Sequence, residues 1–199
     1  MFRTVSIIAF LVTFAGIGIC CLVLPRCKQC RWTPSAVLKR AVHIFTMLLL
    51  EQKSGAVGII RKLAYLLALV CFLVLAITSF FPVLVLEESI NGYWLMLHAT
   101  FAPVFAIALT TLVILWADNY RLNRRTETGK YGLAQKICFW LIVSLALPMV
   151  LSIILSMFAL FGTEGQEFLL NTHRYCALLL SLVAIIYIYL IIRSHMERQ

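Results

Sequence analysis

Charged residues are scarce in this chain of 199 amino acids. Asp, Glu, Lys and Arg make up 13% of the sequence, whereas they make up about 25% of an ordinary soluble domain. Hydrophobic residues reach 63%, and the mean hydropathy is +0.99. This composition excludes a soluble globular domain.

Few residues of the sequence lie outside its long apolar stretches. Five stretches without a charge contain 18 to 29 residues each: Val5–Leu24, Leu63–Leu86, Ser89–Ala117, Ile137–Thr163 and Tyr175–Ile192. At about 1.5 Å per residue, a helix of this length crosses a hydrocarbon core of roughly 30 Å. The longest remaining segment, Pro25–Lys62, has 38 residues, which is too few for a soluble catalytic domain. The expected fold is an all-α integral membrane protein, a transmembrane helix bundle whose chemistry lies among its helices.

Basic residues gather on one side of the membrane if the five helices alternate in direction. The segments Pro25–Lys62, Asp118–Lys136 and Arg193–Gln199 contain 15 of the 17 Lys and Arg residues. The positive-inside rule makes this side cytoplasmic, so the N-terminus and the loops Glu87–Gly92 and Glu164–His173 lie outside. The net charge of +9 is then an insertion signal, and a nucleic-acid partner is not expected. We expect a multi-pass protein of the inner (cytoplasmic) membrane, embedded in the lipid bilayer, with its C-terminus in the cytoplasm.

The first 62 residues differ from the rest of the chain. Val5–Leu24 follows Arg3 as in a secretory signal, but its length and the small residues inside the run favour a retained helix. Ala41–Leu50 has ten residues, too few to span, and its basic flanks are typical of a helix lying in the cytoplasmic interface. We therefore expect two parts. Residues 1–62 form the first span and the interfacial helix, and residues 63–199 form a four-helix transmembrane bundle.

Cys27 and Cys30 have the C-x-x-C spacing of a metal or redox pair. The sequence holds no second pair that would complete four zinc ligands, and the basic residues around the pair favour reactive thiolates. Because a lone pair is a weak signal, two readings stay open: no metal, or an unassigned redox role.

Histidine is also scarce, with four residues, and two of them have similar places. His98 lies near the outer start of the third predicted span, and His173 lies near the outer start of the fifth. Both helices run from outside to inside, so the two imidazoles are expected at matching depth. Intramembrane ionisable residues usually mark function, and imidazole is a standard axial ligand of haem iron. His43 and His195 lie on the interfacial segment and in the tail, where solvated or headgroup-facing side chains are expected.

Small residues near the two histidines leave room for a flat macrocycle. They are Ala99, Ala102 and Ala106 around His98, and Ala177 and Ser181 below His173. Small residues also serve ordinary helix packing, and two histidines near an interface can hydrogen-bond between helices without a ligand. The shared depth of His98 and His173 favours ligation over this alternative.

The last four spans resemble the four-helix membrane cytochrome b of formate dehydrogenases and nickel-iron hydrogenases, and are broadly similar to bacterial cytochrome b561. The resemblance covers about residues 61–193 and rests on the segments Arg61–Tyr65, Ile77–Phe80, Gly92–His98 and Leu169–Tyr175. In that family two haems are stacked through the bilayer. The resemblance implies that His98 and His173 are the axial iron ligands of the outer haem.

The sequence departs from that family at both inner ligands. The residue fourteen positions after His173 is Tyr187, and no histidine occurs in Leu63–Leu86, where the first-helix ligand near Ala64 or Tyr65 is expected. Loss of both members of one pair predicts a derivative with one haem b. Tyr65 and Tyr187 are aromatic anchors at the cytoplasmic interface, or they face a quinone or pack in place of the missing haem.

The resemblance implies a b-type cytochrome subunit of a respiratory complex. One bis-histidine haem b near the outer face would exchange electrons with a periplasmic redox subunit, such as a multihaem cytochrome or an iron–sulfur protein, and with the membrane quinone pool, menaquinone or ubiquinone. The sequence shows no nucleophile with its base and no carboxylate pair in a span. We therefore expect an electron-transfer subunit without catalytic residues of its own. A haem-free membrane anchor derived from a cytochrome b is the alternative, and a small transporter comes third because the spans carry no midplane charge.

Overall fold

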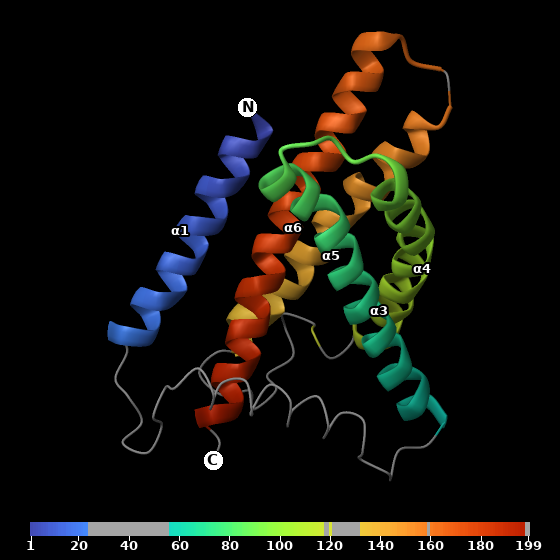
Figure 1. The fold of residues 1–199 in the computed structure, drawn as a ribbon. Helices are drawn as coiled ribbons and strands as arrows, with labels where there is room; N and C mark the ends of the chain where they lie inside the picture. Colours follow the sequence, from blue (N-terminus) through green and yellow to red (C-terminus); the bar gives the residue numbers. More distant parts are fainter. Residues whose placement is uncertain (24–55, 118–119, 121–131, 159, 198–199) are drawn as a thin grey trace. The chain divides into compact units, whose positions relative to one another are not determined.

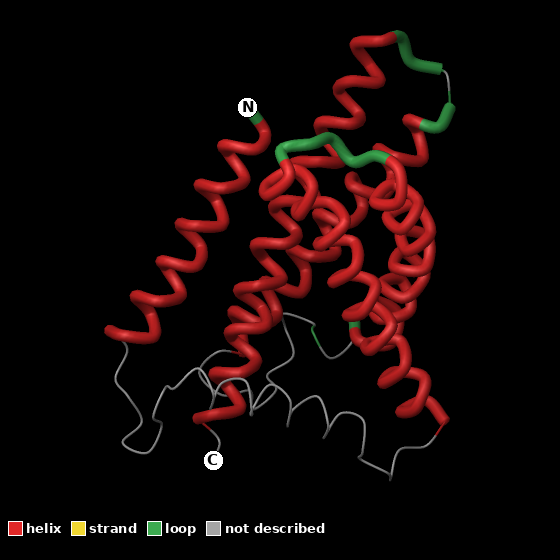
Figure 2. Tube along the Cα trace, viewed as in Figure 1, coloured by secondary structure: helices red, strands yellow, loops and turns green. Residues whose placement is uncertain are grey.

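A computed structural model describes residues 1–23, 56–117, 120, 132–158 and 160–197 of the chain. All regular structure in these residues is helical (Figure 2). In chain order the elements are α1 (Phe2–Val23), α3 (Ala56–Phe81), the short π-helix η1 (Pro82–Leu86), α4 (Gly92–Trp116), α5 (Gly132–Ser156) and α6 (Thr163–Glu197) (Figure 1). Within the described ranges, five helices are long and apolar enough to cross a membrane. The expected all-α membrane fold is confirmed.

The chain forms two compact units. The first contains Met1–Leu24 and Tyr120–Gln199, and we call it the α1–α5–α6 unit. The second contains Pro25–Asn119, and we call it the α3–α4 unit. The expected boundary at residue 62 stays a prediction, and the expected interfacial helix at Ala41–Leu50 lies outside the described residues.

The α3–α4 unit is a hairpin that packs through small side chains. Ala64 and Ala68 of α3 are buried against Ala108 and Leu112 of α4. The three alanines let the two backbones approach closely, as is common where helices pack in a membrane. The heptad spacing of His98, Phe105 and Leu112 places all three on one side of α4.

Helix α3 ends in a π-helical turn at Pro82–Leu86. Pro82 lacks a backbone N–H and so interrupts the α-helical hydrogen-bond ladder. Glu87 then adopts a left-handed conformation with φ 61°, and the backbone N–H of Glu88 donates to the Pro82 carbonyl oxygen at 3.1 Å. The connection to Gly92 agrees with the loop expected at Glu87–Gly92, and its two glutamates are exposed.

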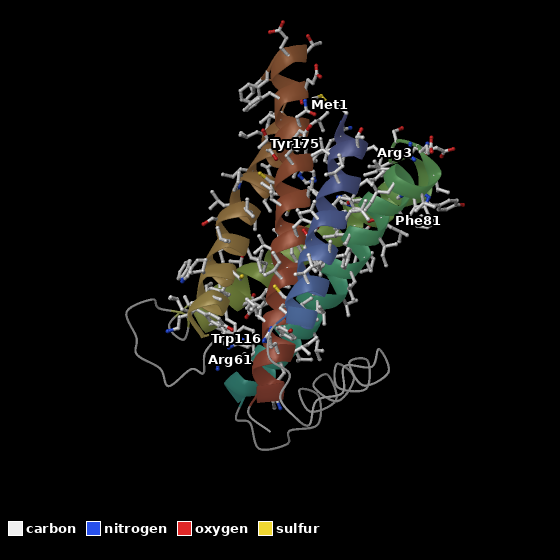
Figure 3. The ribbon with its side chains drawn as sticks, turned by 90° about the vertical axis from the view of Figure 1, so that its left-hand side faces the viewer. Met1, Arg3, Arg61, Phe81, Trp116 and Tyr175 are labelled. Carbon is white, nitrogen blue, oxygen red and sulfur yellow. The ribbon has the colours of Figure 1, made fainter. Side chains whose placement is uncertain are left out.

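In the α1–α5–α6 unit, α5 and α6 pack along each other in opposite directions, and α1 lies beside α6. The Phe2 and Tyr175 rings meet edge to face with centroids 5.4 Å apart. At the other end of α1, the Cys21 Sγ donates to the Tyr189 hydroxyl oxygen at 3.9 Å. Contacts in this order mean that α1 and α6 run parallel, and Figure 3 shows Met1 and Tyr175 at the same end. This direction is the one that five alternating spans require.

One expected helix boundary is wrong. The segment Glu164–His173 is not a loop, because α6 already begins at Thr163. Glu164 lies in the first turn of α6, where the helix dipole favours a negative charge, so a charged residue extends the helix beyond its apolar stretch instead of ending it. Helix α5 ends at Ser156, seven residues before the end of its charge-free stretch at Thr163.

Candidate histidine sites

His98 is fixed against α3 by two hydroxyl groups. Its Nδ1 lies 3.2 Å from the Thr78 Oγ1 and 3.1 Å from the Ser79 Oγ. Thr78 is only 2% exposed, so the contact is sheltered from solvent. On the same side of α4, the Phe105 ring meets the Phe72 ring of α3 at a centroid distance of 6.2 Å. The side of α4 that carries His98 is therefore the side packed on α3.

The two hydroxyl groups beside His98 differ in what they can offer its Nδ1. The Thr78 hydroxyl donates to the Val74 carbonyl oxygen at 2.8 Å, within reach of the Leu75 carbonyl as well. A hydroxyl has one hydrogen, so Thr78 bonds to His98 only as the acceptor of an Nδ1–H. The Ser79 hydroxyl, 3.1 Å from the same Nδ1, can accept that proton or donate its own. Either tautomer of His98 therefore has a hydrogen-bond partner on α3.

His173 is held through Nδ1 by a different kind of partner, a main-chain carbonyl. Its Nδ1 lies 2.9 Å from the main-chain carbonyl oxygen of Met149 on α5. Because the carbonyl has no proton to give, Nδ1 must donate. The same oxygen also accepts a hydrogen bond of 2.9 Å from the Ser152 hydroxyl, and Ser152 is only 3% exposed.

Both imidazoles contact the adjacent helix of their own unit through Nδ1. A metal-bound histidine usually donates its second ring N–H to a neighbouring carbonyl or other acceptor, which fixes the ring and the tautomer. His173 makes such a bond to Met149, and His98 makes one to Thr78 or Ser79 in the tautomer that carries the proton on Nδ1. This observation fits axial ligation of a haem iron through Nε2. His98 and His173 belong to separate units, so one haem shared by both stays a prediction.

His98 has the expected position in its helix, whereas His173 does not. His98 follows the start of α4 at Gly92 by six residues, as the sequence indicates. His173 follows the start of α6 at Thr163 by ten residues, because the helix begins earlier than expected. Among the described residues there is no group of three His, Cys, Asp or Glu side chains able to hold a metal ion, and a haem iron with two axial histidines does not need one.

Small residues flank both histidines along their helices. On α4, Ala102 and Ala106 are half-buried, while Ala99 is exposed. On α6, Ala177 is half-buried, and the buried Ser181 donates its hydroxyl to the Ala177 carbonyl oxygen at 2.8 Å. The Ser181 hydroxyl therefore has its hydrogen-bond acceptor within α6. Toward the neighbouring helices, Ser181 is simply a small side chain.

Tyr187 and Tyr65, which the family resemblance places near inner haem ligands, pack in separate aromatic clusters. The Tyr187 hydroxyl lies 2.6 Å from the Tyr120 hydroxyl, and the Tyr120 ring stacks on Phe139 at 4.4 Å between centroids. The Trp140 indole N–H donates to the Tyr120 carbonyl oxygen at 3.0 Å. In the α3–α4 unit, Tyr65 meets Trp116 edge to face at 5.7 Å. Both tyrosines have a packing role.

Sequence reasoning missed Tyr120 and the role of Arg61. Tyr120 lies between charged residues outside the apolar stretches, and nothing in its surroundings marks it as a partner of Tyr187. The Arg61 guanidinium donates to the Leu115 carbonyl oxygen at 3.1 Å and lies 5.7 Å from the Trp116 ring centroid (Figure 3). It therefore caps the C-terminal end of α4, where a positive charge complements the helix dipole.

The other candidate positions are not described at the level of side chains. His43, Cys27 and Cys30 lie outside the described residues, and His195 falls in the last turns of α6, where the backbone alone is described. Comparison with family models, with curated proteins and with solved structures gives no match. The likeness to membrane cytochromes b therefore rests on the sequence segments that carry it.

Proposed function

We propose that this chain is a membrane-anchored b-type cytochrome subunit in which His98 and His173 hold one haem b. The observation that carries the proposal is that both imidazoles are held by hydrogen bonds at Nδ1. The His173 Nδ1 donates to the Met149 carbonyl oxygen at 2.9 Å, and the His98 Nδ1 lies 3.2 Å from the Thr78 and 3.1 Å from the Ser79 hydroxyl oxygen. Two intramembrane histidines held in this way through Nδ1 are suited to bind a haem iron through Nε2.

The protein supplies ligation, orientation and an apolar environment, and a bound haem supplies one-electron chemistry. The Thr78 and Ser79 hydroxyls hold the His98 ring, and the Met149 carbonyl holds the His173 ring. Thr78 and Ser152 are 2% and 3% exposed, and hydrogen bonds in such sheltered surroundings are stronger than in water. Such fixed rings need little rearrangement when the iron changes its oxidation state.

The proposed partners follow from the place of the histidines along the chain. Both lie in the N-terminal parts of their helices, which face outside by the positive-inside rule. A redox subunit on that side, such as a multihaem cytochrome or an iron–sulfur protein, would then be the partner in aqueous solution. Menaquinone or ubiquinone would be the partner in the membrane, and the substrate chemistry would belong to the larger respiratory complex.

One observation favours a haem-free anchor as the second candidate. The Tyr187 hydroxyl bonds to Tyr120 at 2.6 Å, and this packing contact lies where the family resemblance places an inner ligand. An inner site already used for packing is compatible with a bundle that has lost both haems and only docks a peripheral complex.

The reduced-minus-oxidised absorption spectrum of the purified chain separates these functions. The protein is extracted in mild detergent with its native partners, and haem per chain is counted as the pyridine haemochrome. One b-type haem per chain is the expected result. Two haems would mean that an inner ligand pair exists in spite of Tyr187, and no haem would leave the anchor as the function.

A further inference from the structure

We infer that the connection between α5 and α6 is the docking site of a soluble protein that carries an apolar recess rimmed by basic residues. This connection and the first turns of α6 are called the outer tip, which comprises residues 157–168 except residue 159, which is not described. The outer tip lies at the end of α6 opposite the C-terminus (Figure 1). The inference rests on the proposed function for the side of the membrane and for a soluble redox subunit on that side.

The outer tip lies beyond the hydrocarbon core of the bilayer. The charged residues that bound the apolar part of α6 are Arg174 and Arg193, whose separation of about 28 Å at 1.5 Å per residue is close to the thickness of that core. Because an arginine side chain can extend outward to water, the outer edge of the core lies between Leu170 and Arg174. The Gln166 side-chain amide, above this edge, donates to the Phe158 carbonyl oxygen at 3.3 Å. The chain that follows α5 therefore also lies outside the core.

Three contacts give the outer tip a fixed shape. The hydrogen bond from the Gln166 side chain connects the end of α5 to α6. The Gln166 backbone N–H donates to the Gly162 carbonyl oxygen at 3.0 Å. Phe161 packs so closely on Gly165 that a Cβ atom added there would lie 2.8 Å from the Phe161 Cβ. A surface that is already held in one conformation loses little entropy when a partner binds.

The outer tip exposes large apolar side chains outside the depth at which lipid tails could cover them. Five such side chains are 42% to 82% exposed: Met157, Phe158, Leu160, Phe161 and Phe168. Methionine and aromatic residues are enriched at protein–protein interfaces, and apolar groups exposed together mark an interaction site. Leu179, which is 48% exposed, differs because it lies at the depth of the hydrocarbon core.

The charges of the outer tip indicate what binds there. Glu164 and Glu167 are exposed, and residues 157–168 contain no Lys or Arg. A segment that lies on a membrane surface uses basic residues to attract anionic lipids, so the two acids disfavour the bilayer as the occupant. A symmetric contact with a second copy would bring the same acids together. Basic residues on a soluble partner complement them, and such complementarity speeds association.

Site-specific photo-cross-linking of the full-length chain in native membranes tests the inference. The photoreactive amino acid benzoylphenylalanine replaces Phe158 or Phe168, and in the control it replaces Leu179. Both tip positions are expected to form an adduct with the same soluble protein, whereas the control position is expected to form none with that protein. Mass spectrometry of the adduct is expected to locate the cross-link in a peptide that contains Lys or Arg beside apolar residues.

The yield of the Phe158 adduct tests the charge complementarity. Glu167 lies beyond the first turn of α6, so its replacement leaves the start of the helix intact. Glu167→Gln is expected to lower the yield, and Glu167→Lys is expected to lower it by about tenfold, because like charges then meet across the contact. Added salt is expected to lower the yield of the unmodified chain more than that of Glu167→Gln. Arg174→Gln removes an exposed charge outside the tip and is expected to leave the yield undiminished.

The haem count of the same membranes separates this inference from the proposed function. A full haem count without an adduct at either tip position, or with adducts only to lipid or to a second copy of this chain, overturns the docking site alone. An undiminished yield in Glu167→Lys also overturns it, because the partner then has no basic rim. A haem count of zero together with the expected adducts overturns the cytochrome function and supports docking by a haem-free anchor.

Discussion

The hydroxyl oxygens of Tyr187 and Tyr120 lie 2.6 Å apart. Tyr187 is fourteen residues after His173, which at about 1.5 Å per residue places it about 21 Å further along α6 and within roughly 40° of the same face. A family member would carry its inner haem ligand there. In this chain Tyr187 bonds to a residue beyond the end of α4, so a packing hydrogen bond occupies the position that the resemblance gives to an inner ligand.

Replacing Tyr187 by Phe is expected to destabilise the α1–α5–α6 unit by about 1 kcal/mol, because the Tyr120 hydroxyl loses its phenol partner. The free energy of unfolding in mixed micelles, measured against denaturing detergent, reports the change. Tyr175→Phe is the matched control, since it keeps the ring that meets Phe2. An effect of Tyr187→Phe no larger than that of the control would show that the phenol pair adds nothing to stability. The haem count is expected to stay unchanged in both variants.

The histidine assignment predicts which imidazoles the haem needs. His98→Ala and His173→Ala are each expected to abolish haem binding, because each removes one of the two axial ligands. His43→Ala and His195→Ala are expected to retain it. The pyridine haemochrome of the purified variants measures this directly, and a normal haem content in either of the first two variants would refute the assignment.

Much of the fold follows from the distribution of charge in the sequence, but the helix ends do not. Charge-free stretches predict the five long apolar helices that the structure describes, because an exposed charge in hydrocarbon has a high energetic cost. The same criterion misplaces the start of α6, where Glu164 lies beyond the apolar core in the first helical turn. A charge marks the edge of the hydrocarbon, and a helix can continue through that edge.

The candidate histidines can be chosen from the sequence, whereas their hydrogen-bond partners cannot. Thr78 is recognisable as a polar residue in a span, but its contact with His98 depends on how the α3–α4 hairpin turns at Pro82. The partner of His173 is the carbonyl oxygen of Met149. Because every residue carries a carbonyl, no side-chain pattern in the sequence could have indicated that one.

Close packing of α3 on α4 predicts that Ala68 does not tolerate a larger side chain. Ala68 is 6% exposed and packs in the cluster with Ala64, Ala108 and Leu112. Ala68→Leu is expected to lower the free energy of unfolding by about 1–3 kcal/mol, since extra methylenes force the two backbones apart. Ala15→Leu on the exposed side of α1 is the same substitution without that crowding. Equal free energies of unfolding for the two variants in detergent would contradict the close packing of α3 on α4.

The orientation of the chain gives the last prediction. Ser89 lies exposed in the connection between η1 and α4, which the distribution of Lys and Arg places outside. A maleimide that cannot cross membranes is expected to label Ser89→Cys in intact cells above the background of the native cysteines.

Thr126→Cys, in the basic segment that the same rule assigns to the cytoplasm, is expected to react only after the cells are opened. Both variants are compared with the unmodified chain, since native thiols contribute to the signal. The reverse pattern would place His98 and His173 near the cytoplasmic face, and their redox partner would then have to be a cytoplasmic protein. Labelling therefore decides on which side of the membrane the donor or acceptor of this chain is to be sought.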